Sequence, residues 1–268
     1  HIVVPSESIR RILAELYGVH ERVTVIPTGI DLRPYETAVG ATIRQQKGWG
    51  DDRVLISIGR LAKEKNWHTL VAAAANVIRT LPDTRLIILG DGEERENLQK
   101  QARELGVADR IELPGIVPFD EVPHYLKAAD LFCFASVTET QGLVTLEAMA
   151  GECPVVAVGA SGTSDVIAHE VEGLLTRNDA SALAEAMVRV LQDDDLRHSL
   201  SAAALAKAKL YDSKRQAVGL TAVYEQAIAD KAANRFVQVD NQKPLLKGKW
   251  FELLGFEKNP FRRLSAGQ

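Results

Sequence analysis

Short apolar runs alternate with longer segments of helical periodicity through most of this chain. After Arg53 come the runs VLISIG, RLIILG, IELPG, LFCFAS and PVVAVG, separated by segments whose apolar residues follow a helical spacing. Such runs are typical of strands that are buried on both faces by the intervening helices. The pattern therefore predicts an α/β fold with a doubly wound parallel sheet, completed by C-terminal helices over 196–210 and 213–233.

The same pattern divides the chain into five segments. A strand at 2–5, a helix from Ser6 and a strand at 23–29 predict a βαβ unit. The residues that follow lack a clear apolar period and are rich in turn formers, so we interpret them as a connecting segment. The chain opens in a strand, with neither an initiator Met nor a signal-peptide pattern, and we expect it to be part of something longer. The segments are the unit 1–35, the connection 36–52, the sheet-forming domain 53–212, a helix at 213–235 and a tail at 236–268.

Composition and charge narrow the function classes. The 268 residues are 46% hydrophobic and 25% charged, with a formal net charge of -4, and acidic and basic residues are interspersed. This distribution disfavours nucleic acid as a partner. We expect Cys133 and Cys153 to be core residues of a cytoplasmic protein, because two cysteines do not make a multi-cysteine metal site. No apolar run is long enough to predict a membrane span.

Ligands of an open parallel sheet bind at the carboxyl ends of the strands, which fixes the loops to inspect. After VLISIG, the residues Gly59, Arg60 and Lys65 place two cations beside a helix start, an arrangement suited to a diphosphate. After RLIILG, the GDG turn lacks the third glycine of a dinucleotide fingerprint. After IELPG, the backbone around Val117 is able to line a nucleobase pocket. Taken alone, each loop is also compatible with an ordinary solvated connection.

The stretch TETQGLVTLE carries the most specific chemistry. We expect Glu139 in a loop, Gly142 at a turn that permits close backbone approach, and a helix beginning near Leu143. The N–H groups of that helix start suit an anion, and Glu147 projects from its first turns. Two carboxylates beside an anion site are able to accept hydrogen bonds from two diols, which are the ribose and the hexose of a nucleotide sugar. A surface Glu and a helix Glu with no such role remain the alternative.

Four motifs in this order resemble the retaining GT-B glycosyltransferases of family four. They are GRLAKEKN, LGDGEERENL, LPGIVP and ETQGLVTLE, and VIPTGID before them resembles the end of that family's N-terminal domain. The resemblance covers nearly all of 53–212. It implies that this segment is the Rossmann-like C-terminal half of a GT-B fold, which binds the nucleotide sugar. It also implies that 1–35 is a remnant of the N-terminal acceptor domain and that 36–52 is the interdomain linker.

The resemblance assigns roles residue by residue. Arg60 and Lys65 would bind the donor diphosphate and stabilise its departure, so no divalent metal is required. Glu139 would contact the transferred sugar and Glu147 the ribose. Gly59 and Val117, with the backbone of Gly142, Leu143 and Val144, would complete the donor site. The implied reaction transfers a hexose, glucose from UDP-glucose, with retention, and Glu139 as a covalent nucleophile is a weaker alternative. The acidic run at 193–195 is expected to begin a helix rather than to bind metal.

Two positions depart from the family pattern. Gln141 stands where most members have an aromatic residue, and Thr28 stands where they have Asn. Both variants resemble the branch that glucosylates diacylglycerol, which would suit the tail, where Trp250 and Phe251 accompany several Lys and Arg residues. Such a tail is able to bind an anionic membrane surface at the inner face of the membrane. Alternatively, it packs back across a neighbouring domain.

A domain that binds donor without its acceptor partner cannot close a cleft around the reacting groups. We therefore expect this chain to bind a nucleotide sugar and to be catalytically incomplete, because most of the N-terminal acceptor domain is missing. Two alternatives stay open: a non-catalytic nucleotide-sugar-binding module, and a GT-B nucleotide-sugar epimerase. A dinucleotide oxidoreductase is disfavoured by the missing glycine fingerprint.

Overall fold

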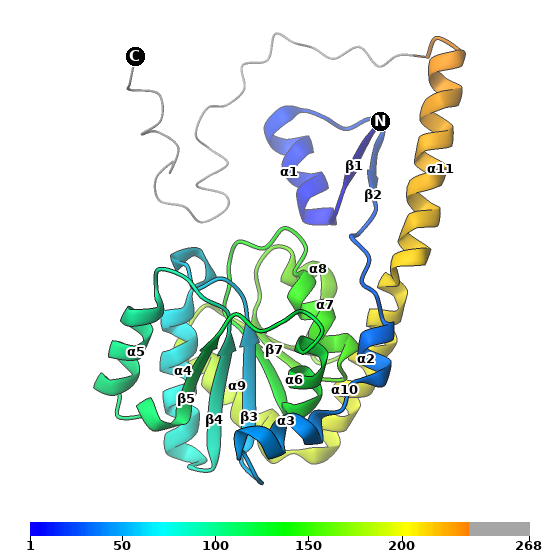
Figure 1. Ribbon diagram of the computed structural model, residues 1–268. Coiled ribbons are helices and arrows are strands. Elements are labelled where there is room, and N and C mark those ends of the chain that lie inside the picture. The colour runs from blue at the N-terminus through cyan, green and yellow to red at the C-terminus, as the bar shows by residue number, and fades with distance from the viewer. Residues whose placement is uncertain (236–268) are drawn as a thin grey trace.

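The computed structural model describes residues 1–235, and the tail at 236–268 lies outside the described residues. Its main body is a parallel sheet of six strands in the order β5-β4-β3-β6-β7-β8 (Figure 1). The strands are β3 (Arg53–Ile58), β4 (Thr84–Leu89), β5 (Ile111–Gly115), β6 (Leu131–Phe134), β7 (Val155–Val158) and β8 (Gly173–Thr176). The chain runs outward from β3 to β5 and then returns to place β6 on the other side of β3. The predicted doubly wound sheet is confirmed.

Helices cover both faces of the sheet because neighbouring strand residues point to opposite sides. Val54 and Ile56 pack with α6 (Val122–Ala128) and α7 (Leu143–Ala150), whereas Leu55 packs with α4 (Trp67–Thr80) and α9 (Ala180–Gln192). The remaining helices of this body are α5 (Arg95–Glu104), α8 (Thr163–Val166) and α10 (Asp194–Ala208). Cys133 and Cys153 are fully buried in these cores, as expected from the sequence. The fold thus has two apolar layers.

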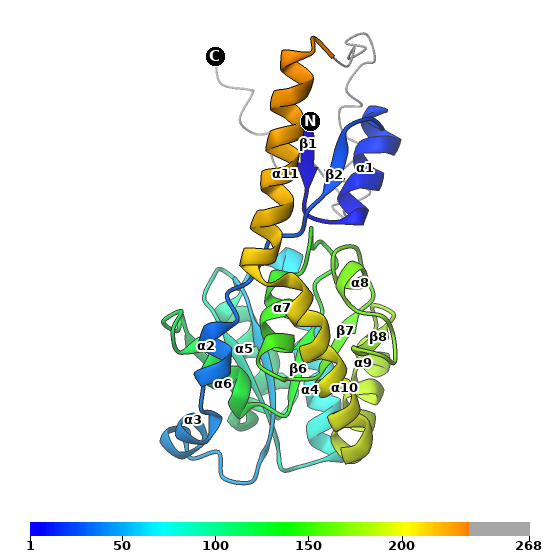
Figure 2. The same cartoon turned by 90° about the vertical axis from the view of Figure 1, so that its right-hand side faces the viewer.

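The N-terminal residues form the predicted βαβ unit. β1 (Ile2–Val4) and β2 (Val23–Val25) pair in parallel, with α1 (Glu7–Tyr17) between them along the chain. Gly18 ends α1 in the left-handed conformation. Figure 2 shows this unit beyond the carboxyl end of the large sheet, beside the long helix α11 (Ser213–Ala232). The unit therefore lies on the side of the sheet where ligands of parallel sheets bind.

The connecting segment contains two short helices that the sequence pattern did not predict. They are α2 (Arg33–Thr37) and α3 (Gly40–Lys47), and α3 packs against α6. Ile43 and Trp49 are almost fully buried. At Gly40 a Cβ atom would lie 2.3 Å from the backbone carbonyl of Lys127. The helices depend on tertiary burial, which a local period does not report.

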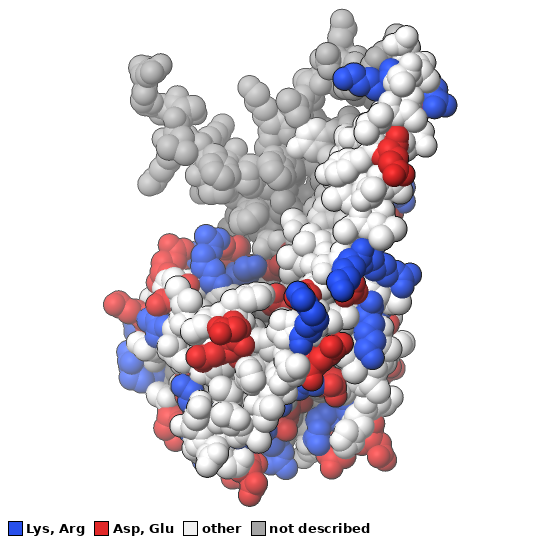
Figure 3. All heavy atoms as spheres, turned by 45° about the vertical axis from the view of Figure 1, so that its right-hand side comes forward, with Lys and Arg blue, Asp and Glu red and all other residues white. Residues whose placement is uncertain are grey.

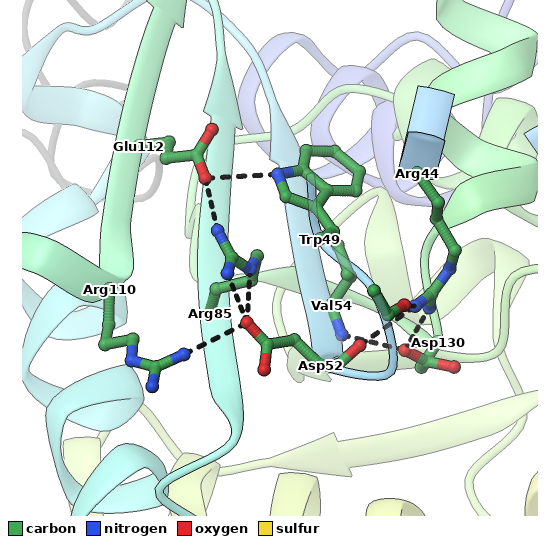
Figure 4. Close-up of polar contacts among 9 residues, drawn as sticks. Arg44, Trp49, Asp52, Val54, Arg85, Arg110, Glu112 and Asp130 are labelled. Atoms are coloured by element: carbon green, nitrogen blue, oxygen red, sulfur yellow. Dashed lines mark hydrogen bonds and ion pairs between the residues drawn. The ribbon is translucent and has the colours of Figure 1, made fainter. Parts of the chain in front are cut away.

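A network of ion pairs joins this connecting segment to the amino ends of the sheet strands (Figure 4). Asp52 accepts hydrogen bonds from Arg110 at 3.0 Å and from Arg85, which also donates to Glu112 at 2.7 Å. Arg44 pairs with Asp130 at 2.7 Å, and Trp49 Nε1 donates to Glu112 at 3.1 Å. The network lies at the end of the sheet opposite the candidate ligand loops, which follow the carboxyl ends of the strands. Its charges therefore satisfy one another in a structural role.

The acidic run at 193–195 begins a helix, as predicted. The Asp193 side chain caps α10 by accepting a hydrogen bond from the Leu196 N–H at 2.9 Å. Asp194 and Asp195 follow in the first turn, where carboxylates are favoured by the helix dipole. These carboxylates stabilise the helix start.

Candidate functional site

The loops after β3 and β6 meet where the strand order reverses. Asn66 Nδ2 donates to the Ala135 carbonyl at 3.0 Å, and Thr138 Oγ1 donates to the Glu64 carbonyl at 3.3 Å. Asn66 itself has a positive φ of 57° and precedes α4. These contacts bring together loops that are far apart in sequence. They place Lys65 of one loop beside Glu139 of the other.

Lys65 and Glu139 form an ion pair at this crossing. The Lys65 Nζ atom lies 2.6 Å from Glu139 Oε1, and the two side chains are 24% and 13% exposed. Partial burial makes such a pair stronger than a solvated one, since less water screens it. The sequence identified both residues but not their contact. In this pair the cation and the carboxylate neutralise each other.

Arg60 does not join this pair. Its guanidinium contacts Glu64, and its side chain is 71% exposed. The backbone is better fixed than the side chain, because the Arg60 carbonyl accepts a hydrogen bond from Trp67 Nε1 at 2.8 Å, and the Gly59 N–H donates to Leu89 at 2.9 Å. An exposed pair of this kind contributes little stability. Arg60 is thus free to turn toward another anion.

The start of α7 presents free backbone donors. Gly142 precedes the helix with φ 75° and ψ 48°, the left-handed conformation that glycine adopts without strain. The Thr145 and Leu146 N–H groups donate to the Gly142 carbonyl at 3.0 and 3.2 Å. Within residues 1–235 the N–H groups of Leu143 and Val144 have no hydrogen-bond partner. The predicted helix start is present, with Leu143 39% exposed, and free N–H groups of this kind suit an anion.

Gly162 supports the loop that carries Glu139. A Cβ atom on Gly162 would lie 2.4 Å from the Glu139 carbonyl oxygen and 2.9 Å from the Gln141 nitrogen. Its φ of 79° is also in the left-handed region. Because any side chain here would push the loop away, Gly162 allows the loop to lie directly on the turn before α8.

Glu147 has different surroundings from Glu139. It is partly buried and lines a cavity of about 140 Å³ together with Tyr35, Phe119 and Leu143. Burial raises the pKa of this carboxyl group. Val117 is partly buried and packs against the core. Phe119, two residues later, is 74% exposed. The helix start therefore has one candidate carboxylate in an ion pair and the other in a small cavity.

Sequence reasoning missed two contributors. Tyr35 lines the Glu147 cavity from the connecting segment, where the sequence shows no period that would single it out. Gln141 was noted only as a departure from a pattern, yet its amide bonds the backbone of Thr28 on both sides, at 2.8 and 2.9 Å. Each contact joins residues that are more than a hundred positions apart in the sequence. Only the tertiary structure places them.

Within residues 1–235 no group of three His, Cys, Asp or Glu side chains gathers as metal ligands do. None of the helices in this part of the chain combines the length and the apolar character needed to cross a bilayer.

Two family profiles match the chain. Glycosyl transferases group 1 matches residues 40–207, and Glycosyltransferase Family 4 matches residues 1–33. The first covers the whole sheet and the loops described above. The second covers the βαβ unit and its exit toward α2.

Relatives and solved structures agree with these matches. The alpha-monoglucosyldiacylglycerol synthase of Streptococcus pneumoniae is 33% identical over 209 residues, which are 75% of this chain and 47% of that protein. The D-inositol 3-phosphate glycosyltransferase of Thermobispora bispora is 34% identical over 239 residues, 85% of this chain and 56% of that protein. The chain thus spans about half the length of these curated relatives.

The crystal structure of Anabaena Alr3699/HepE in complex with UDP and glucose has a TM-score of 0.74 to this chain, with 26% identity. The likeness covers 87% of this chain and 62% of that one. The family profile over 40–207 and the parallel sheet, with its candidate loops at the carboxyl ends of the strands, agree on one family. The chain belongs to the glycosyl transferases group 1 family and has the Rossmann-like architecture of a GT-B domain.

Proposed function

We propose that this chain is the donor-binding part of a retaining hexosyltransferase that uses UDP-glucose. The observation that carries the proposal is the Lys65–Glu139 ion pair at 2.6 Å, in the loop that leads into the free N–H groups of α7. A diphosphate at the helix start would attract Lys65 and release Glu139 toward the sugar hydroxyls. Glu147, in its cavity, would accept hydrogen bonds from the ribose.

The chemistry follows from these positions. As the bond between the sugar C1 and the diphosphate oxygen breaks, negative charge grows on the diphosphate, and Lys65 and the α7 backbone stabilise it. Arg60 adds a second cation after leaving its exposed contact with Glu64. The acceptor oxygen bonds to C1 from the face that the diphosphate leaves, and its proton passes to a diphosphate oxygen. This route needs no covalent intermediate on Glu139, whose released carboxylate accepts hydrogen bonds from the sugar hydroxyls.

The relatives support the proposed donor. A solved neighbour carries UDP and glucose, and another relative is named for monoglucosyldiacylglycerol. We propose that an acceptor domain packs beside the βαβ unit and α11. Val218, Tyr224 and Ile228 of α11 are 72%, 58% and 70% exposed, and Figure 3 shows mostly uncharged side chains over the middle of this helix, with charged ones toward both ends. An apolar exposed stripe of this kind is typical of an interface.

The donor assignment is tested by calorimetric titration of the chain with UDP, UDP-glucose, GDP-mannose and NADH. We expect UDP-glucose to bind and NADH to give no heat. Glu147→Gln should weaken UDP binding about tenfold, because the amide loses one acceptor of the charged hydrogen-bond pair. Glu185→Gln, on the exposed face of α9, is the matched control. Equal binding of UDP by wild type and Glu147→Gln would refute the proposed contact between Glu147 and the ribose. Tighter binding of GDP-mannose than of UDP-glucose would make GDP-mannose the donor.

We further propose that the acceptor is a diacylglycerol lipid and that the protein binds an anionic membrane surface. The support is the name of the relative from Streptococcus pneumoniae and the basic aromatic composition of 236–268. Sedimentation with phosphatidylglycerol vesicles should pellet the chain at low salt and not at high salt. Lys247→Gln/Lys249→Gln should reduce pelleting several-fold, since each basic residue near the surface contributes about 1 kcal/mol. Binding that is unchanged by salt and by these substitutions would contradict the proposal.

A further inference from the structure

Gln141 links the candidate donor loop to the N-terminal βαβ unit. Its side chain is 4% exposed and lies between Glu139 and Gly142 in sequence. The Oε1 atom accepts from the Thr28 N–H at 2.8 Å, and Nε2 donates to the Thr28 carbonyl at 2.9 Å. This amide-to-backbone pair resembles one rung of a strand pairing. It is therefore directional and holds the two segments in one register.

The loop is held from two other sides as well. Ser6 Oγ, 4% exposed, donates to the Thr140 carbonyl at 2.6 Å. Gly162 leaves room for the Glu139 carbonyl, as described above. Thr140 is thus held by Ser6 between β1 and α1, and Gln141 by Thr28 after β2. Glu139 lies against the turn before α8. Two of these three contacts come from the N-terminal unit.

We propose that Gln141 is a positioning residue: through the Thr28 backbone, the N-terminal unit sets where the Glu139 carboxylate lies. The inference rests on the proposed function, in which Glu139 contacts the transferred sugar. In this role Gln141 acts through the loop and not by contact with the sugar or the diphosphate. A movement of the N-terminal unit relative to the sheet would pass through this amide into the loop, so the position of that unit determines whether the sugar is held.

Exchange and binding measurements on the whole 268-residue chain test this role. Gln141→Met keeps the length and volume of the side chain and removes both hydrogen bonds. Gln46→Met, on the exposed surface of α3 at the far end of the domain, is the matched control. In Gln141→Met we expect hydrogen–deuterium exchange of the Thr28 amide, whose N–H loses its acceptor, to quicken about tenfold, with Gln46→Met unchanged. Unchanged exchange at Thr28 in Gln141→Met would overturn the inference.

Binding separates positioning from a general loss of structure. We expect Gln141→Met to lower the ratio of UDP-glucose to UDP affinity about fivefold and to leave UDP affinity within about twofold. Glu139→Gln should lower the same ratio, and the double variant should fall no further, because Gln141 acts through Glu139. Equal losses for UDP and UDP-glucose would refute the role. If the wild type binds neither ligand, the proposed function fails, and the exchange result alone decides the linkage.

Discussion

Two glutamates near the start of α7 have opposite electrostatic surroundings. Glu139 forms an ion pair with the Lys65 ammonium, 2.6 Å away. Glu147 lies in a cavity beside Tyr35, and burial raises the pKa of its carboxyl group. Without a ligand the Glu147 carboxylate therefore weakens the fold. A buried carboxylate that weakens the fold is typical of a residue retained for function.

Glu147→Gln should stabilise the protein at neutral pH and not in acid. A raised pKa means that the folded state binds the proton more tightly, so wild-type stability falls as pH rises from the ordinary value of 4.5 through the raised one. The amide has no such penalty. Urea unfolding should show a higher free energy of unfolding for the variant at pH 7 and a vanishing difference below 4.5. Glu185→Gln reports the effect of an exposed substitution, and a gain that is equal at both pH values would contradict this reasoning.

At the scale of elements, the loop before α7 and the turn before α8 are built as one packed unit. The Glu139 carbonyl occupies the space that a side chain at position 162 would take. The candidate site depends on this contact, because the loop that carries Glu139 has no regular secondary structure of its own. Backbone packing of this kind makes the site sensitive to a single methyl group.

Gly162→Ala should therefore destabilise the protein by about 3 kcal/mol. About 1 kcal/mol comes from the left-handed backbone and the rest from overpacking against the Glu139 carbonyl. Gly106→Ala is the matched control, because Gly106 has φ 72° and no atom within 4 Å of an added Cβ. Urea unfolding of the two variants isolates the packing contribution. Equal losses would mean that the loop yields to the methyl group without cost.

At the scale of the whole molecule, α11 attaches the N-terminal unit to the sheet domain. Asp230 of α11 is 6% exposed and contacts His1 at 2.8 Å, Arg22 at 3.4 Å and Arg235 at 3.0 Å. At the other end of the unit, Ile30 bonds the backbone on both sides of Asp212. Figure 2 shows α11 running beside this unit. The N-terminal unit is thus held by α11, the last helix within residues 1–235.

Asp230→Asn should loosen this attachment. The amide cannot neutralise Arg22 and its neighbours, and we expect a loss of about 1–3 kcal/mol, the usual penalty for removing one partner from a buried charged contact. Limited proteolysis should cut the N-terminal unit faster in the variant, while the sheet domain stays intact. Asp195→Asn, at an exposed helix start, is the control. Equal cleavage of Asp230→Asn and wild type would show that the unit is held by its other contacts.

Local sequence was sufficient for much of the site. The strand ends, the loop position of Glu139, the turn at Gly142 and the start of α7 all follow from periods and turn residues. The placement of Arg60 was not foreseen, because its partner Glu64 lies one turn away and competes with the site for the guanidinium. The helices α2 and α3 also escaped prediction, since Ile43 and Trp49 are buried by α6 and the sheet rather than by a repeating pattern of their own.

The parallel sheet, its loops and the residue types that those loops carry follow from the amino-acid sequence alone. Apolar runs and turn residues act over a few positions, and that range is enough to specify strands, helices and their ends. Three contacts depend instead on tertiary packing: Lys65 meets Glu139, Glu147 lies in a cavity with Tyr35, and Gln141 holds Thr28. Each contact joins segments that no local period connects, and its geometry depends on how both cores pack.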